Sequence, residues 1–268
     1  MTGLKLAVSL LWYAGDTLAR ALRTLVGRRP EPGFVVLYYH GVSAEDRAGF
    51  ARQMEALVRR ATVLRPGFNG TLPGGRNFVA VTFDDAFRSV AANALPELVS
   101  RQLPSAIFVP VDFIGEPPGW EMEADAAGEQ VMSVDELRSL PDLVQLGSHT
   151  LRHPHLPRLD DTRLRDELVT SRGKLAELLA KPVTLLAFPY GEYDNRALAV
   201  CREAGYERVF AIDPRPADPR GDDYVRGRVA VDPSDGRLLF HLKTRGAFAW
   251  MPYASGLKRW ILARRSLR

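Results

Sequence analysis

The chain has 268 residues, of which 46% are hydrophobic and 25% are charged. This composition excludes a disordered, a collagen-like or a coiled-coil protein. A single cysteine, Cys201, excludes an internal disulfide and a cysteine-based zinc site. The length is compatible with one large α/β domain, because α/β barrels often exceed about 200 residues.

Residues 1–29 are expected to form a segment of their own. Apolar residues recur at helical spacing through residues 4–27, which predicts an amphipathic helix. The apolar run at 6–14 is far shorter than the roughly 20 residues that cross a bilayer. No small-residue cleavage site follows this run, so we expect neither a transmembrane span nor a signal peptide.

Residues 30–242 are predicted to form the main domain, in which short β-branched runs alternate with helical stretches. Strands are predicted at 34–39, 78–83, 105–110, 143–147, 183–188, 207–212 and 225–231. Helices are predicted at 45–60, from 86 onward with an interruption near Pro96, and at 160–180. Two more helices are predicted from their N-caps: one begins at Ser133, with capping-box spacing to Glu136, and one runs from Asp194 to Gly205. This alternation predicts a parallel sheet, and at this length a closed or nearly closed β/α barrel with its chemistry at the carboxyl ends of the strands. An open doubly wound sheet is the competing architecture, although the chain has no strand–GxGxxG–helix element.

Residues 243–268 form a basic tail with seven basic residues and no acid. Residues 257–265 are expected to form a second amphipathic helix, with basic residues and one tryptophan. Residues 1–30 carry five basic residues and one acid, so two basic ends flank an acidic body. Such faces suit an anionic lipid surface; alternatively, both helices pack on the body and turn their charges to solvent. Nucleic acid is not an expected partner, because no recognition motif accompanies the arginines.

Polar residues follow two of the predicted strands. Asp84 and Asp85 come directly after the second strand, and burial of two adjacent carboxylates is costly unless a cation is bound. His149 and His153 follow the fourth strand, and one helical turn between them would let both imidazoles face one point. With Asp85 they predict a metal site of two histidines and one carboxylate, with open positions for water and substrate.

Three ordered motifs carry a family resemblance: TFDD at 82–85, SHTLRHPHL at 148–156 and FPYG at 188–191. Over roughly residues 34–240 the chain resembles the NodB-homology polysaccharide deacetylases, carbohydrate esterase family 4. The resemblance implies a distorted (β/α)7-type barrel that removes N-acetyl groups from amino sugars. It also implies a divalent metal, commonly zinc, with cobalt, nickel or manganese as alternatives.

The resemblance also implies roles for individual residues. Asp84 would be the general base, and Asp85, His149 and His153 would be the metal ligands. The turn Pro189-Tyr190-Gly191 presents backbone N–H groups at the same end of the sheet, and the Tyr190 N–H is expected to stabilise the oxyanion.

Two features depart from the family pattern. The arginine that many members carry just before PYG is absent, so Arg226 or Arg228 on the last strand is expected to supply this charge near the substrate. Alternatively, this arginine lies on the surface of an edge strand.

The general acid is the second departure. His40, at the end of the first strand, is preferred to His241, although a buried histidine bound to a backbone carbonyl would look the same in the sequence.

The loop at 115–130 contains five acids and Trp120, which either stacks on a sugar ring or packs beneath the loop. The expected function is metal-dependent removal of N-acyl groups, such as that of N-acetylglucosamine, from a polysaccharide or lipid-linked envelope glycan. A cytoplasmic protein bound peripherally to the inner membrane face is the expected location. Rival functions are a glycan-binding domain without turnover, a deformylase or cyclic-amide hydrolase, and a non-haem iron oxygenase.

Overall fold

A computed structural model describes residues 3–73, 77–120, 128–218 and 220–254. Its strands form one sheet in which every strand pair is parallel, in the order β8-β7-β6-β5-β4-β3-β1-β9, with β2 paired to β3. The strands are β1 (Gly33–Tyr39), β2 (Thr62–Val63), β3 (Asn77–Phe83), β4 (Ser105–Val109), β5 (Val144–Ser148), β6 (Leu185–Ala187), β7 (Arg208–Phe210), β8 (Val225–Arg226) and β9 (Val229–Ala230). The predicted parallel, barrel-like α/β fold is confirmed.

The last strand joins the two ends of this sheet. β8 pairs with β7 and β9 pairs with β1, although only two residues separate β8 from β9. The expected single strand at 225–231 is therefore wrong, because the chain must turn from one neighbour to the other. Gly227 lies at this turn, where a Cβ atom would be 2.1 Å from the carbonyl oxygen of Asp213. A side chain at this position is sterically excluded.

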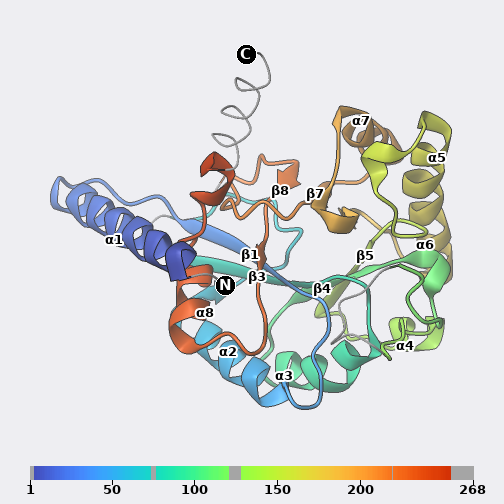
Figure 1. Cartoon of the computed structure of the whole chain (residues 1–268), viewed down its shortest axis with the longest axis horizontal. Helices are drawn as coiled ribbons and strands as arrows, with labels where there is room; N and C mark the ends of the chain where they lie inside the picture. The colour runs from blue at the N-terminus through green and yellow to red at the C-terminus, as the bar shows by residue number, and fades with distance from the viewer. Residues whose placement is uncertain (1–2, 74–76, 121–127, 219, 255–268) are drawn as a thin grey trace.

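Helices surround the strands (Figure 1). They are α1 (Gly3–Leu25), α2 (Arg47–Arg60), α3 (Leu95–Ser100), α4 (Val134–Arg138), α5 (Asp161–Arg165), α6 (Ser171–Leu179), α7 (Asn195–Ala204) and α8 (Arg237–Thr244), with π-helical segments η1 (Val90–Ala94) and η5 (Asp166–Thr170) and 3-10 turns η2 (Val111–Phe113), η4 (Leu156–Arg158) and η6 (Pro189–Gly191). None of the helices in the described part of the chain is both long enough and apolar enough to cross a membrane. The tail helix expected at 257–265 lies outside the described residues.

Local signals in the sequence are confirmed at several helix ends. Ser133 and Glu136 form the predicted capping box, and the Asp194 carboxylate accepts a hydrogen bond from the backbone N–H of Ala197. At the interruption expected near Pro96, the chain stays helical but changes from the π-helical segment η1 to the α-helix α3, and the proline occupies the first turn of α3. A proline is tolerated there, since it needs no N–H partner in a first turn.

Side-chain alternation along the strands positions the site. On β3, Phe78 and Ala80 belong to the inner core cluster of the barrel, whereas Val79 and Val81 pack in the larger cluster that includes helix residues. Successive strand residues point to opposite faces. Asp84, two residues after Thr82 on the inward face, is thereby placed at the carboxyl end of the barrel interior.

Candidate active site

Asp84 is bound by Arg228. The Arg228 guanidinium donates from Nη1 to Oδ1 of Asp84 (2.6 Å) and from Nη2 to Oδ2 (2.9 Å), and both side chains are buried. Burial by itself raises the pKa of Asp84, but the positive charge and hydrogen bonds of Arg228, aided by His149, lower this pKa to about 2. Asp84 is therefore an ionised carboxylate at any physiological pH.

Arg228 is held in place on all sides. Its guanidinium lies over the rings of Tyr38 (4.8 Å), Phe108 (5.5 Å) and Phe210 (5.9 Å), and its Nε donates to the carbonyl of Ala211. These cation–π contacts replace part of the lost hydration of the cation. Of the two arginines expected to carry the missing charge, Arg228 is the one that contacts Asp84, from the interior of the barrel.

Arg226 has a different environment. Its guanidinium donates to the Asp223 carboxylate and to the carbonyl of Pro66, and not to Asp84. The two arginines are both fully buried, and only their partners distinguish them.

Asp85, His149 and His153 form a compact cluster. Nε2 of His149 lies 3.6 Å from Oδ1 of Asp85, and Nε2 of His153 lies 3.5 Å from the same oxygen. One ligand atom from each residue lies within 4.8 Å of the others, and all three side chains are buried. The structure thus brings together the three residues that the sequence grouped as metal ligands.

The polar atoms of this cluster fit a cation. Among the described residues, Oδ1 of Asp85 has no hydrogen-bond partner. Nδ1 of His149 donates to the carbonyl of Ala187 (2.8 Å), which leaves the lone pair of its Nε2 facing the cluster. Burial lowers the pKa of His149 to about 4 and that of His153 to about 2, so both rings are neutral at pH 7, the form in which an imidazole can bind a metal. Burial and the nearby Asp84 charge raise the pKa of Asp85, a cost that a bound cation would remove.

The two histidines lie on a loop, so the expectation of a helical turn between them is wrong. Residues 149–155 contain no helix, and Thr150 and His153 have φ angles of 66° and 56°. Of the seven non-glycine residues with positive φ in the described ranges, five lie at this site: Asp85, Ala86, Thr150, His153 and Tyr190. Such conformations are costly and persist where the surroundings enforce them.

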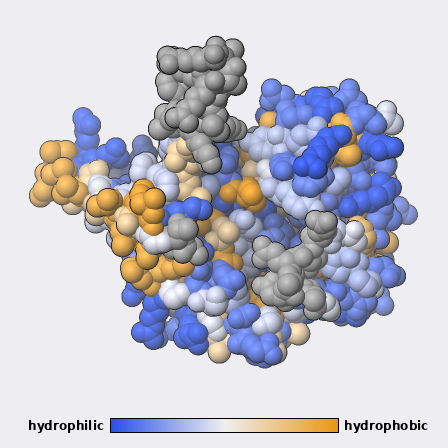
Figure 2. Space-filling view, viewed as in Figure 1, coloured by the Kyte–Doolittle hydropathy of each residue, from blue (hydrophilic) through white to orange (hydrophobic). Residues whose placement is uncertain are grey.

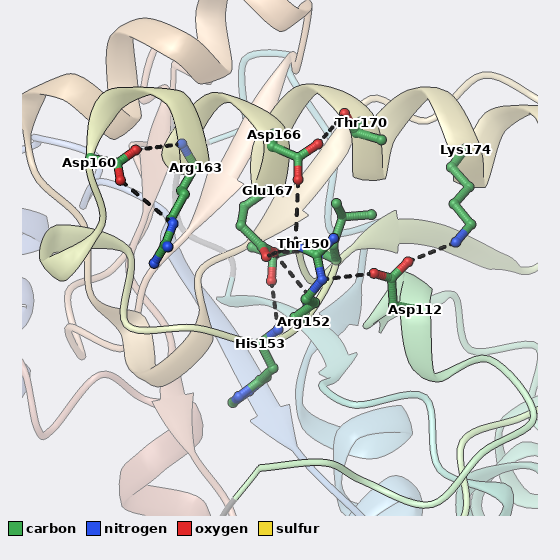
Figure 3. Close-up of polar contacts among 11 residues, drawn as sticks. Asp112, Thr150, Arg152, His153, Asp160, Arg163, Asp166, Glu167, Thr170 and Lys174 are labelled. Atoms are coloured by element: carbon green, nitrogen blue, oxygen red, sulfur yellow. Dashed lines mark hydrogen bonds and ion pairs between the residues drawn. The ribbon is translucent and has the colours of Figure 1, made fainter.

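Glu167 enforces the conformation of this loop. One oxygen of its buried carboxylate accepts from the backbone N–H groups of Leu151 and Arg152, and the other accepts from the Arg152 guanidinium (Figure 3). The loop is closed internally by the Thr150 hydroxyl, which accepts from the N–H of His153. The sequence offers no signal for this role, because Glu167 is one of several acids in a predicted helix.

The Pro189-Tyr190-Gly191 turn lies beside the cluster. The Tyr190 ring packs edge-on against His153 (4.7 Å between ring centroids) and is stacked on His155 (4.1 Å). His155 in turn contacts Glu192 at 2.8 Å. These contacts hold Tyr190 in its left-handed conformation, with its side chain 37% exposed. The role of its backbone N–H remains a prediction.

The three remaining candidate residues do not form one cluster. Trp120 is stacked on His153 (4.4 Å between ring centroids, 20° between ring planes) and contacts Phe113, so it covers a predicted metal ligand. His40 is exposed at the end of β1, and its electrostatic interaction with Asp84 is a minor cause of the lowered pKa of that carboxylate, after Arg228 and His149. His241 instead lies on α8 within 3.1 Å of the Tyr13 hydroxyl of α1.

Comparison with known sequences identifies one family. The sequence profile described as polysaccharide deacetylase matches residues 72–209, just over half of the chain. The poly-beta-1,6-N-acetyl-D-glucosamine N-deacetylase of Staphylococcus aureus (strain MRSA252) is 23% identical over 163 residues, or 57% of this chain and 54% of that protein. The chain therefore spans about half the length of the curated relatives that it matches.

Solved structures share the fold. IcaB from Ammonifex degensii is 26% identical with a TM-score of 0.65, over 82% of this chain and 99% of that one. The deacetylase PplD of Streptococcus pyogenes, solved in complex with acetate, is 18% identical with a TM-score of 0.65, over 80% of this chain and 98% of that one. Both alignments include nearly the whole of the solved chain.

Proposed function

Because this chain belongs to the polysaccharide deacetylase family, we propose that it is a metal-dependent hydrolase that removes N-acetyl groups from amino sugars of a glycan. One observation carries the proposal: a buried, ionised carboxylate, Asp84, lies next to a buried cluster of Asp85, His149 and His153. A domain that only binds glycans has no need of such a costly pair of adjacent carboxylates.

Asp85, His149 and His153 would hold the divalent cation. Two imidazoles and one carboxylate suit zinc first, with cobalt, nickel or manganese as alternatives. When bound, such a cation polarises the amide carbonyl and lowers the pKa of water. Asp85 supplies the negative charge of the site, and the Ala187 carbonyl fixes the orientation of His149.

Asp84 would act as the general base. It accepts a proton from the water molecule that attacks the amide carbon, while the backbone N–H of Tyr190 donates to the oxygen that becomes negative. Arg228 keeps Asp84 ionised and also makes it a weak base, so efficient proton transfer needs an acidified water. Before it accepts this proton, the buried Asp84 carboxylate is stabilised by Arg228 and does not depend on hydration.

His40 would protonate the leaving nitrogen. Cleavage of the C–N bond requires a proton on the amine, and the products are acetate and the free amino sugar. His40 follows β1, the strand adjacent to β3, and is exposed to an approaching substrate. His241, bound to Tyr13, is not placed for this step.

The glycan is proposed to contain N-acetylglucosamine. The Staphylococcus aureus relative is named for a β-1,6-linked polymer of this sugar, which makes that linkage the first to test. We extend the proposal to glycans that are still linked to a lipid carrier at the inner membrane face, since α1 presents an apolar surface beside the catalytic domain.

The test is acetate release from β-1,6- and β-1,4-linked N-acetylglucosamine oligomers by metal-stripped and zinc-reloaded protein. We expect zinc-dependent release that Asp84→Asn abolishes. Asp142→Asn is the matched control, because the Asp142 side chain is 96% exposed on the surface. Binding of one zinc per chain without acetate release from either oligomer would contradict the proposed reaction on N-acetylglucosamine.

A further inference from the structure

Helix α1 has two different sides. One side packs against α8 and the segment that follows it: Ser9 is buried and accepts a hydrogen bond from the indole Nε1 of Trp250 (2.9 Å), and the Tyr13 hydroxyl lies 3.1 Å from Nε2 of His241. Leu6 adds to a small apolar cluster there. The helix is thus anchored to the body by its more polar side.

The opposite side of α1 carries large apolar side chains into solvent. Four leucines recur every seven residues, which places them along one side of the helix with a drift of only about 20° per repeat. The exposed fractions are Leu4 75%, Leu11 74%, Leu18 62%, Leu22 53%, Leu25 81% and, just past the helix, Val26 71%. We call these six residues the leucine face. Figure 2 shows hydrophobic residues gathered at the projecting end of the molecule, where Figure 1 places α1. Monomeric soluble proteins rarely expose so continuous an apolar surface.

Basic residues accompany the leucine face. Lys5, Arg23, Arg28 and Arg29 are exposed and have no acidic partner among the described residues. Asp16, the one acid between residues 3 and 30, is already bound to Arg20 (2.6 Å). An occupant of this surface must therefore be both apolar and anionic.

We infer that the leucine face is the surface by which the protein binds an anionic phospholipid membrane. α1 would lie in the membrane plane with the leucine face at the boundary of the acyl chains and the cations at the headgroups. The protein body, packed on the other side of the helix, would then remain in water. No described helix can span a bilayer, in agreement with a helix that lies in the interface.

A second copy of the chain fits this surface less well. In a coiled coil the positions beside the leucine seam usually carry charges of both signs. Here one flank of the seam is Ala7, Ala14 and Ala21, which widens the apolar surface beyond a coiled-coil seam. Self-association would also bring the unpaired cations of two copies together. A bilayer accepts a wide apolar surface and complements the charge.

The test is flotation of the full chain with vesicles of mixed phosphatidylcholine and phosphatidylglycerol, compared with pure phosphatidylcholine. We expect binding to the mixed vesicles that weakens as salt is raised. Leu11→Gln/Leu18→Gln/Leu25→Gln should lower partitioning by at least about 100-fold. Arg23→Gln/Arg28→Gln/Arg29→Gln should lower it by about fivefold for each cation removed.

The matched control is Val58→Gln/Val99→Gln/Val169→Gln, which removes exposed apolar side chains from other helical segments and should bind like the wild type. If the triple leucine variant does not fold, Leu25→Gln alone replaces it in the flotation test, because Leu25 is the most exposed of the six residues. This single variant should also bind the mixed vesicles more weakly than the wild type. The inference is independent of the proposed catalysis, so Asp84→Asn should bind vesicles normally. It is overturned if the wild type does not float, if the leucine variants float equally well, or if the leucine face instead forms a dimer that does not bind lipid.

Discussion

Arg228 and Asp84 form a two-point ion pair across 144 residues of sequence, with hydrogen bonds of 2.6 and 2.9 Å in the interior of the barrel. The strand segment around Gly227 brings the arginine to this position, where it turns from β7 to β1. The positive charge beside Asp84 thus comes from the segment between β8 and β9. The same segment therefore closes the barrel and keeps Asp84 ionised.

Replacement of Arg228 by lysine should change the pH dependence of acetate release. Lysine keeps the charge but cannot form two parallel hydrogen bonds, so burial would raise the pKa of Asp84 from about 2. Because Asp84 must be ionised to accept a proton, activity should be lost at a higher pH as the solution is acidified. We also expect kcat/KM at neutral pH to fall by about tenfold to a hundredfold.

Arg226→Lys is the control for this experiment. Arg226 is as buried as Arg228 but is bound to Asp223, so its replacement should lower stability and leave the acidic limb unchanged. An unshifted acidic limb in Arg228→Lys would show that the pair does not set the charge of Asp84.

His40→Asn should slow amide hydrolysis by about 10² to 10⁴-fold, because the amine would leave without a proton donor. An aryl acetate with an acidic phenol needs no proton donor, because its phenolate leaves without protonation. This variant should therefore cleave such an ester at close to the wild-type rate. His241→Asn, altered next to Tyr13, should leave both reactions unaffected. Equal losses on amide and ester would indicate that His40 has another role.

Glu167→Gln should weaken metal binding. The carboxylate accepts hydrogen bonds from two backbone N–H groups and one guanidinium of the loop that carries His153. Loss of its charge would weaken these bonds and leave the His153 side chain less firmly positioned. We expect zinc affinity, measured by competition with a chromophoric chelator, to fall by about 10- to 100-fold. The increase in melting temperature on zinc addition should shrink accordingly.

The neighbouring Asp166→Asn serves as the control for Glu167. Asp166 is half-buried, and its contact with the Arg152 guanidinium is longer (3.4 Å against 3.0 Å for Glu167) and includes no loop backbone N–H, so its replacement should leave zinc affinity unchanged. If Glu167→Gln bound zinc with wild-type affinity, the hydrogen bond from the His153 N–H to the Thr150 hydroxyl would be enough to hold the loop.

Gly227→Ala should destabilise the fold by about 3 kcal/mol, since the added methyl group would lie 2.1 Å from a backbone oxygen. Gly173→Ala is the opposite case: Gly173 is the third residue of α6, and no heavy atom lies within 4 Å of the added methyl group. That substitution should stabilise by up to about 1 kcal/mol. Urea denaturation of both variants measures the difference, and equal stabilities would contradict a tight strand crossing at Gly227.

Local patterns in the sequence correctly predicted where β1 and β3 end and which polar residues follow β3. Alternation of side chains along β3 directs Asp84 inward, and the spacing of Ser133 and Glu136 fixes a helix start. These features depend on a few consecutive residues, so local periodicity and hydrogen bonding encode them. Asp85, His149 and His153 could be grouped before their distances were known because they follow two strands of a predicted parallel sheet, whose carboxyl ends lie at one end of the barrel.

Contacts between distant segments could be assigned only from the folded structure. It distinguished Arg228 from Arg226, two residues apart on the same short stretch, because the bend at Gly227 gives them different neighbours. It also replaced the expected helical turn between the histidines by a loop that Glu167 holds. Finally, it showed which side of α1 packs on the body and which side is exposed. Each of these depends on packing between elements far apart in the chain, which no local pattern specifies.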